Sequence, residues 1–322
     1  MIYNQNLNDQ KKVLNHEGTE CHRVSPEMEL YTLACSMAMP PKFYEMPQAQ
    51  IDRLVLLMRN VDAEYVARLA VYVRTHMGLR SVPLLMAVEL ARLHSGDNLV
   101  SRMVEKVVVR ADEIAELLMC YQWRNPSVGI KKLGRLSNQI RRGLQHAFNQ
   151  FDEYQFAKYD NKQLNVKMRD ALFIVHPKPK DDEQQKIFDK IANDQLQIPY
   201  TWETELSRLG QQAYEDEHAR EMAFRQKWEE LVVSGKLGYM ALLRNLRNIL
   251  NAGVKEDVIR SVADRIADEH EVARARQFPF RYLSAYKELL NVASVHTPLI
   301  LNALEDAAIA SAKRIQGINP TD

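Results

Sequence analysis

Residues 157–179 read AKYDNKQLNVKMRDALFIVHPKP. An apolar run from Ala171 to Val175 breaks at His176 into alternating proline and lysine. Because proline lacks a backbone N–H and disfavours helix in the residue before it, Pro177 is expected to end a helix here. His176 is then expected to cap that helix or to begin a loop, with Lys178 facing outward. The reason for a basic end on an apolar helix has to come from its neighbourhood.

That neighbourhood is strongly basic in a chain that is almost neutral. The 322 residues carry a net charge of +1, yet residues 117–180 hold twelve lysines and arginines against four acidic residues, a net +8. No aspartate or glutamate occurs from Leu117 to Phe151, and the rest of the chain therefore sums to −7. Such asymmetry marks a candidate surface for phosphate backbones.

The spacing of apolar residues predicts an almost entirely helical chain. Pro26 indicates a helix start, Asp62 an N-cap, and Ser81 the start of another helix. The run 107–109 is all valine and has strand propensity, but it continues a helical period and has no hairpin partner. Further helices are expected near residues 99–109, 111–123, 136–150, 183–193, 203–212, 219–233, 239–251, 255–267, 278–292 and 298–314.

Helices of this length, joined by short turns, predict an all-α chain of stacked helical pairs, as in α-solenoids with HEAT or armadillo repeats. Because no crisp sequence repeat is visible, a compact irregular α domain stays an alternative. No low-complexity linker divides the chain. The polar stretch 177–185 is interpreted either as an internal break or as a long loop between two helices.

A helix over residues 136–150 would display part of the basic block. Its buried stripe is predicted to be Leu136, Ile140, Leu144 and Phe148. Arg135, Arg142 and His146 share another side, and Arg141 projects about 100° from Arg142. Arginine suits phosphate because its planar guanidinium donates paired hydrogen bonds and stacks on unpaired bases. The aromatic residues that follow are either stacking platforms or, as is commoner at this spacing, core residues: Phe151, Tyr154, Phe156 and Tyr159.

Composition disfavours several classes of protein. The three cysteines, Cys21, Cys35 and Cys120, have no C-x-x-C spacing and predict buried thiols rather than disulfides or a zinc site. No apolar stretch approaches the roughly 20 residues that span a bilayer. The N-terminus, MIYNQNLNDQKK, is polar where a signal peptide would be apolar, so a cytoplasmic protein is expected.

No nucleotide-binding or hydrolase motif points to catalysis. Glu215 and His218 have the spacing found on di-iron helices, but the second motif and the further carboxylates of such a site are not evident. His16, Cys21 and His22 lack a fourth spaced metal ligand. We therefore expect no catalytic residue, no metal site and no cofactor.

Three stretches resemble the TROVE family, the module shared by Ro autoantigen, telomerase-associated and vault-associated proteins. They are IRRGLQHAF at 140–148, the stretch quoted above at 157–179, and YMALLRNLRNIL at 239–250. Weaker similarity extends from about residue 16 to about residue 316. The resemblance implies an N-terminal extension of residues 1–15 and a TROVE module over residues 16–318. Such modules are HEAT-like helical pairs arranged as an α-solenoid that forms a closed or nearly closed ring.

The resemblance also implies a function. Ro-type members bind small structured Y RNAs on the outer surface of the ring and take single-stranded 3′ ends of defective RNAs through its hole. In these members, Y RNA is bound in part by the lysine of the K-Y run, by a basic residue a few positions on, and by the histidine of the H-x-K-P run. The matching residues here are Lys158, Lys162 and His176, although this sequence has one extra residue before Lys162. Arg244 and Arg247 either line the hole or form surface salt bridges. The predicted RNA-binding residues are Lys131, Lys132, Arg135, Arg141, Arg142, Lys158, Lys162, His176, Lys178 and Arg244.

One departure from the family pattern concerns ring closure. Ro-type proteins usually continue into a von Willebrand A domain with a D-x-S-x-S metal site, and this sequence contains no D-x-S-x-S, so no Mg²⁺ site of that kind is expected. The ring then closes by direct contact of its ends, is bridged by a partner protein with an A domain, or stays open; alternatively, the chain is one module of a longer protein.

The sequence therefore predicts a non-catalytic ribonucleoprotein component. Its expected partners are small noncoding RNA, single-stranded RNA 3′ ends and an exoribonuclease. The rival function is a helical-repeat scaffold that binds a peptide or an effector protein. The basic block separates the two hypotheses, because a scaffold would not need a local charge of +8.

Overall fold

The computed structural model describes residues 12–14, 18–22, 24–37, 47–126, 136–160 and 163–314. In these ranges the chain is helical apart from one short hairpin, so the predicted all-α class is confirmed. Two compact units divide the chain, unit 1 from Met1 to Ile198 and unit 2 from Pro199 to Asp322. The predicted module over residues 16–318 spans parts of both.

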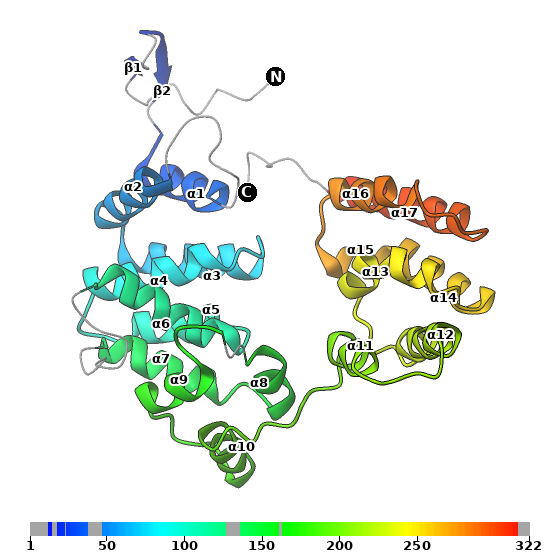
Figure 1. The fold of residues 1–322 in the computed structure, drawn as a ribbon. Coiled ribbons are helices and arrows are strands. Elements are labelled where there is room, and N and C mark those ends of the chain that lie inside the picture. The colour runs from blue at the N-terminus through cyan, green and yellow to red at the C-terminus, as the bar shows by residue number, and fades with distance from the viewer. Residues whose placement is uncertain are drawn as a thin grey trace. The chain divides into compact units, whose positions relative to one another are not determined.

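Unit 1 begins with the antiparallel strands β1 (Lys12–Leu14) and β2 (Glu20–His22), which the sequence analysis does not predict. Its helices stack in successive layers, for example α1 against α2, α3 against α4 and α5 against α7 (Figure 1). They are α1 (Pro26–Ser36), α2 (Pro47–Asn60), α3 (Ala63–Thr75), α4 (Ser81–Leu93), α5 (Leu99–Val107), α6 (Asp112–Arg124), α7 (Asn138–Phe148), α8 (Glu153–Tyr159), α9 (Met168–Val175) and α10 (Asp182–Ala192).

Unit 2 repeats the same kind of stacking, with α13 against α14 and α16 against α17. Its helices are α11 (Trp202–Gly210), α12 (Glu217–Val233), α13 (Tyr239–Asn251), α14 (Glu256–Ala267), α15 (Glu269–Ala275), α16 (Pro279–Leu289) and α17 (Thr297–Lys313). Each unit has its own apolar core.

Local sequence signals set the helix ends as predicted. Asp62 caps α3 by accepting hydrogen bonds from the backbone N–H groups of Glu64 and Tyr65, at 2.8 and 3.2 Å. Pro26 stands at the first turn of α1 behind a Ser25 cap. The valine run ends helix α5 at Val107 and forms no strand. In such short helices, caps of this kind supply partners for N–H groups that the helix itself leaves unpaired.

The polar stretch 177–185 is not a boundary between units. It contains most of the loop that joins α9 to α10, together with the first turn of α10, and all of it lies within unit 1. The boundary between the two units comes later, after Ile198. The alternative interpretation, a loop between two helices, is the one found.

Free, partly buried thiols are found at Cys35 and Cys120. Burial, with a smaller contribution from the nearby Glu89 carboxylate, raises the pKa of the Cys120 thiol to about 12. Such a thiol is a poor nucleophile at neutral pH, which agrees with the structural role predicted for it. Within the described ranges, no helix is long and apolar enough to cross a bilayer.

Helix α7 carries three members of the predicted buried stripe, and the fourth, Leu136, lies two residues before the helix begins. All four are buried: Leu136, Ile140, Leu144 and Phe148. The helix packs closely on α5 because Gly143 has no side chain. A Cβ atom at Gly143 would lie 2.5 Å from Cβ of Val104 and 2.7 Å from the carbonyl oxygen of Ser101. Glycine is therefore required at this position of the IRRGLQHAF motif.

We expect Gly143→Ala to lower the free energy of unfolding of unit 1 by about 1–3 kcal/mol, because α7 and α5 must separate to admit the extra methyl group. Urea unfolding measures this change. Gly210→Ala is the matched control, because Gly210 lies at the end of α11 with no atom within 4 Å of its added Cβ. Equal stability of the two variants would mean that α5 and α7 are not closely packed at Gly143.

Candidate nucleic-acid interface

The basic end of α9 is held against α7 by two amide side chains. His176 caps α9 in the left-handed conformation, with φ 48°, and its N–H donates to the carbonyl oxygen of Leu172. Pro177 and Pro179 prevent the segment 176–180 from continuing as a helix. Its carbonyl groups therefore need donors from elsewhere.

Those donors are Gln145 and Asn149 on α7 and just beyond its end. Gln145 Nε2 donates to the carbonyl oxygens of Val175 and His176 at 3.0 and 3.1 Å. Asn149 Nδ2 donates to the carbonyl oxygen of Lys178 at 2.8 Å. The backbone N–H of Lys180 donates to Asn149 Oδ1 at 3.1 Å, and Lys180 Nζ donates to the Asn149 carbonyl oxygen at 3.1 Å. We call these contacts the amide clamp.

The amide clamp brings the segment 176–180 beside the outward face of α7. Arg142 and His146 precede Asn149 by seven and three residues, so they lie on the helix side that carries the amide clamp. Both side chains are exposed, as are those of His176 and Lys178. None of these four side chains pairs with a carboxylate in the part of the chain that the structure describes. We call Arg142, His146, His176 and Lys178 the basic surface.

The two neighbouring arginines of α7 differ in their surroundings. Arg142 is exposed, whereas Arg141 is half-buried and its Nε atom is buried without a hydrogen-bond partner among the described residues. Only Arg142 therefore shares the amide clamp's side of the helix with a freely exposed guanidinium. Sequence spacing separates the directions of the two side chains but gives no measure of this difference in burial.

An exposed aromatic ring adjoins the basic surface. Phe173 is 51% exposed, although the apolar run 171–175 predicts a core segment. It follows Arg169 by four residues and precedes His176 by three, so the three side chains lie along one face of α9. The Arg169 guanidinium lies 5.8 Å from the centre of the Phe173 ring. An exposed ring between two basic side chains can stack on an unpaired base while its neighbours contact phosphates.

The other aromatic residues of the basic block divide between core and surface. Phe151 and Phe156 are buried, as the commoner interpretation predicts, and their rings pack edge to face at 5.8 Å. Tyr154 is 45% exposed. The Lys158 ammonium, at the end of α8, lies 5.5 Å from the Tyr154 ring centre and 5.6 Å from that of Tyr159.

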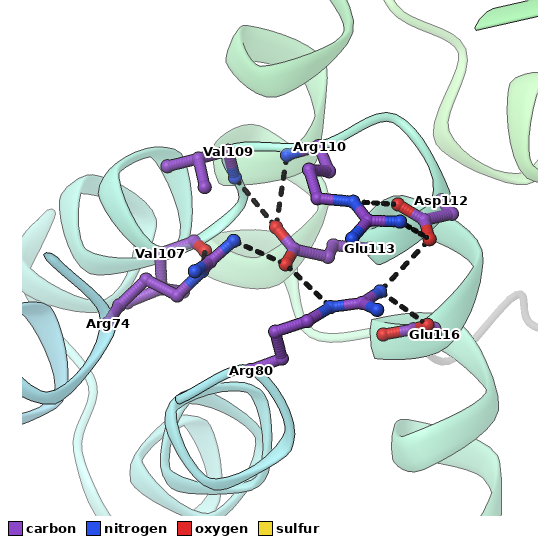
Figure 2. A network of polar contacts seen from close by, with 8 residues as sticks. All are labelled: Arg74, Arg80, Val107, Val109, Arg110, Asp112, Glu113 and Glu116. Atoms are coloured by element: carbon purple, nitrogen blue, oxygen red, sulfur yellow. Dashed lines mark hydrogen bonds and ion pairs between the residues drawn. The ribbon is translucent and has the colours of Figure 1, made fainter. Parts of the chain in front are cut away.

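Tyr159 connects Lys158 to a buried ionic network. The Arg110 guanidinium lies 4.3 Å from the Tyr159 ring centre and donates to the Asp112 carboxylate at 3.1 and 2.8 Å. In Figure 2, Arg110 and Asp112 border a network centred on Glu113, at the turn between α5 and α6. The position of Arg110 therefore depends on that turn.

The Glu113 carboxylate is fully buried and accepts four hydrogen bonds (Figure 2). Arg74 Nη2 and Arg80 Nε donate to Oε1 at 2.6 and 3.3 Å. The backbone N–H groups of Val109 and Arg110 donate to Oε2 at 2.9 and 3.0 Å. Through Arg74 on α3 and Arg80 beside the start of α4, one carboxylate joins four helices of unit 1.

Five of the ten predicted RNA-binding residues are placed in unit 1: Arg141, Arg142, Lys158, His176 and Lys178. The structure brings Arg142, His176 and Lys178 together at the amide clamp, and it places Lys158 beside the tyrosine pair. Arg244 is exposed on α13 in unit 2. Lys131, Lys132, Arg135 and Lys162 lie outside the described residues.

The alternative interpretations of other polar residues also have outcomes. Arg247 forms an ion pair with Glu288, the surface salt bridge that the sequence analysis offers as one alternative. No cluster of three or more potential metal ligands occurs within the described ranges, which include Glu215 and His218. His16 lies outside those ranges.

Sequence reasoning missed Gln145, Asn149, Arg169 and Phe173. The amide side chains gave no signal, because an amide on an exposed helix face looks like any solvated polar residue. The spacing of Arg169, Phe173 and His176 was a usable signal, since three residues at intervals of four and three share one helix face.

Stacked helices and an exposed basic surface define the class of this chain as an all-α protein of stacked helices with a basic face. The TROVE domain family model matches residues 193–297. That range includes the 239–250 motif but neither the 140–148 nor the 157–179 motif. With the relatives described next, this match confirms the resemblance of the chain to the TROVE family.

Two curated relatives extend the similarity beyond that range. Telomerase protein component 1 of Rattus norvegicus is 25% identical over 344 residues, and that of Mus musculus is 24% identical over 337 residues. Both alignments cover 82% of this chain but only 13% of the relative, so the chain corresponds to a small part of these proteins.

A solved structure has a similar fold. The crystal structure of the Deinococcus radiodurans Ro (RSR) protein matches with a TM-score of 0.59 and 18% sequence identity. The match covers 91% of this chain and 65% of the Ro chain. At this identity the likeness concerns the fold alone.

Proposed function

We propose that this chain is a non-catalytic RNA-binding protein whose unit 1 contacts RNA through the basic surface. The observation that carries the proposal is the amide clamp, which fixes His176 and Lys178 beside Arg142 on the exposed side of α7. The similarity to the TROVE family supports an RNA partner, as does the net charge of +8 over residues 117–180. Exposed arginine and lysine side chains without carboxylate partners are suited to phosphate oxygens.

The finer proposal concerns the kind of RNA. We infer small structured noncoding RNAs of the Y RNA type, together with single-stranded 3′ ends of structured or defective RNAs. Phosphate contacts supply most of the affinity, and Phe173 stacks on unpaired bases, so sequence preference is loose. The proposal extends to HEAT-like repeats, a cytoplasmic location, and an exoribonuclease or A-domain protein as partner.

Equilibrium binding to a small stem-loop RNA, with and without a single-stranded 3′ tail, tests the function. We expect binding that weakens steeply between about 50 and 200 mM salt, because released counterions favour association at low salt. A double variant with Lys158→Ala and His176→Ala is expected to bind much more weakly. Absence of binding at both salt concentrations would overturn the proposal.

Phe173→Ala is expected to weaken binding of tailed RNA by about 1–3 kcal/mol, the usual contribution of one stacked base. The slope of affinity against salt concentration is expected to stay unchanged, because no charge is lost. Fluorescence of a 2-aminopurine in the tail reports the stacking directly. Phe173→Tyr is the matched control and is expected to retain both affinity and quenching. Wild-type affinity in the alanine variant would remove the stacking role but leave phosphate binding standing.

A further inference from the structure

A groove of about 250 Å³ lies between α13 and α16 of unit 2, and its floor is aliphatic. Leu243 and Leu246 of α13 and Leu289 of α16 line it and are buried. Met240 and Ala285 are partly buried members of the lining. The groove therefore offers an apolar slot that a side chain of a bound molecule could fill.

The rim of this groove is basic. Arg244, Arg247 and Arg281 line it, and the single acidic residue of the lining, Glu288, is paired with Arg247. Arg244 and Arg281 have no carboxylate partner in the described part of unit 2. Residues 199–322 hold eighteen acidic and sixteen basic residues, a net charge of −2. The rim is therefore positively charged within a unit whose net charge is negative.

One exposed aromatic side chain adjoins the groove on α16. Phe280 is 55% exposed and precedes the lining residue Ser284 by four positions, so the two share one side of the helix. The Phe280 ring already stacks on Phe278, with centres 6.0 Å apart, and the Arg281 guanidinium lies 5.3 Å from its centre. Exposed apolar surface next to a groove is typical of a protein-interaction site.

We propose that this groove docks an acidic amphipathic segment of a partner protein. Apolar side chains at helical spacing enter the slot, and the flanking carboxylates pair with Arg244 and Arg281. This is the helix-in-groove mode of recognition, with charge complementarity at the rim. The floor favours a peptide over RNA, because bases stack on aromatic planes rather than on leucines and the Phe280 ring is already engaged. This inference is independent of RNA binding by unit 1.

A displayed library of segments of about 14 residues, roughly four helical turns, tests the proposal on the full chain. Apolar and acidic positions are each randomised within their class. Enriched segments are then synthesised, and their affinity is measured by fluorescence anisotropy, with a single-stranded oligonucleotide as competitor. We expect enriched segments to bind and the oligonucleotide not to displace them.

Two variants locate the site. The pair Arg244→Glu and Arg281→Glu reverses the rim charges, and Ser284→Trp blocks the slot from an exposed position on α16. Each is expected to weaken binding at least tenfold. The control pair Lys255→Glu and Lys313→Glu reverses the same number of exposed charges outside the groove and is expected to bind as the native chain does. Circular dichroism confirms that all variants keep their helices.

Three results would overturn the proposal. They are no enrichment from the acidic library, enriched segments that bind the groove variants as tightly as the native chain, and displacement of the segments by the oligonucleotide at matched concentration. The last result would assign the groove to single-stranded nucleic acid. RNA binding by unit 1 is measured separately, so its failure does not affect this outcome.

Discussion

Replacing Arg142 and Lys178 together by alanine is expected to weaken binding of structured RNA about a hundredfold at ~0.1 M salt. Each phosphate contact changes the slope of log affinity against log salt by about one, which corresponds to about a factor of ten at that concentration. The slope is therefore expected to fall by about two. Titrations at several salt concentrations measure both quantities.

The control for this experiment removes two charges elsewhere, with Lys186→Ala on α10 and Lys313→Ala on α17. Both lysines are exposed and neither belongs to the basic surface. If the control pair flattened the slope as much as the test pair, binding would depend on net charge alone and the basic surface would not be the site.

Replacing Glu113 by alanine is expected to cost about 3–5 kcal/mol of unit 1 stability. Its carboxylate is fully buried, and its loss leaves Arg74, Arg80 and two backbone N–H groups without their acceptor. Removing one partner of a buried ionic network is costly, because the opposite charges stay buried and uncompensated.

Hydrogen exchange can measure this loss separately in the two units. Amides of α3 to α6 are expected to lose protection in Glu113→Ala, whereas those of α13 and α14 are not. Glu64→Ala is the control, because Glu64 pairs with Arg68 at 2.6 Å on the exposed surface, where an ion pair contributes little. Similar losses of amide protection in both variants would show that the buried network around Glu113 stabilises unit 1 no more than an exposed ion pair does.

The sequence predicted the helices well because their signals are local. Asp62 caps α3 through N–H groups two and three residues away, and Ile140, Leu144 and Phe148 are spaced to be buried on one helix face. The hairpin of β1 and β2 was missed because each strand has only three residues, too few for an alternating pattern.

The candidate site was predicted only in part, because its decisive contacts join distant residues. Gln145 and Asn149 meet carbonyl groups about thirty positions further along the chain, which no spacing rule reaches. The apolar run gave no sign that Phe173 is exposed, since Ala171, Leu172 and Val175 face inward while Phe173 does not. Charge, by contrast, located the basic block without any knowledge of the fold.

The amide clamp has a consequence for the kinetics of binding. A segment that is already ordered loses little conformational entropy when a ligand arrives, and no rearrangement delays the encounter. Exposed positive charges further accelerate the approach of a polyanion at low salt. Association at the basic surface should therefore be fast in variants that keep both the amide clamp and its charges, such as Phe173→Ala, and their loss of affinity should appear as a shorter residence time.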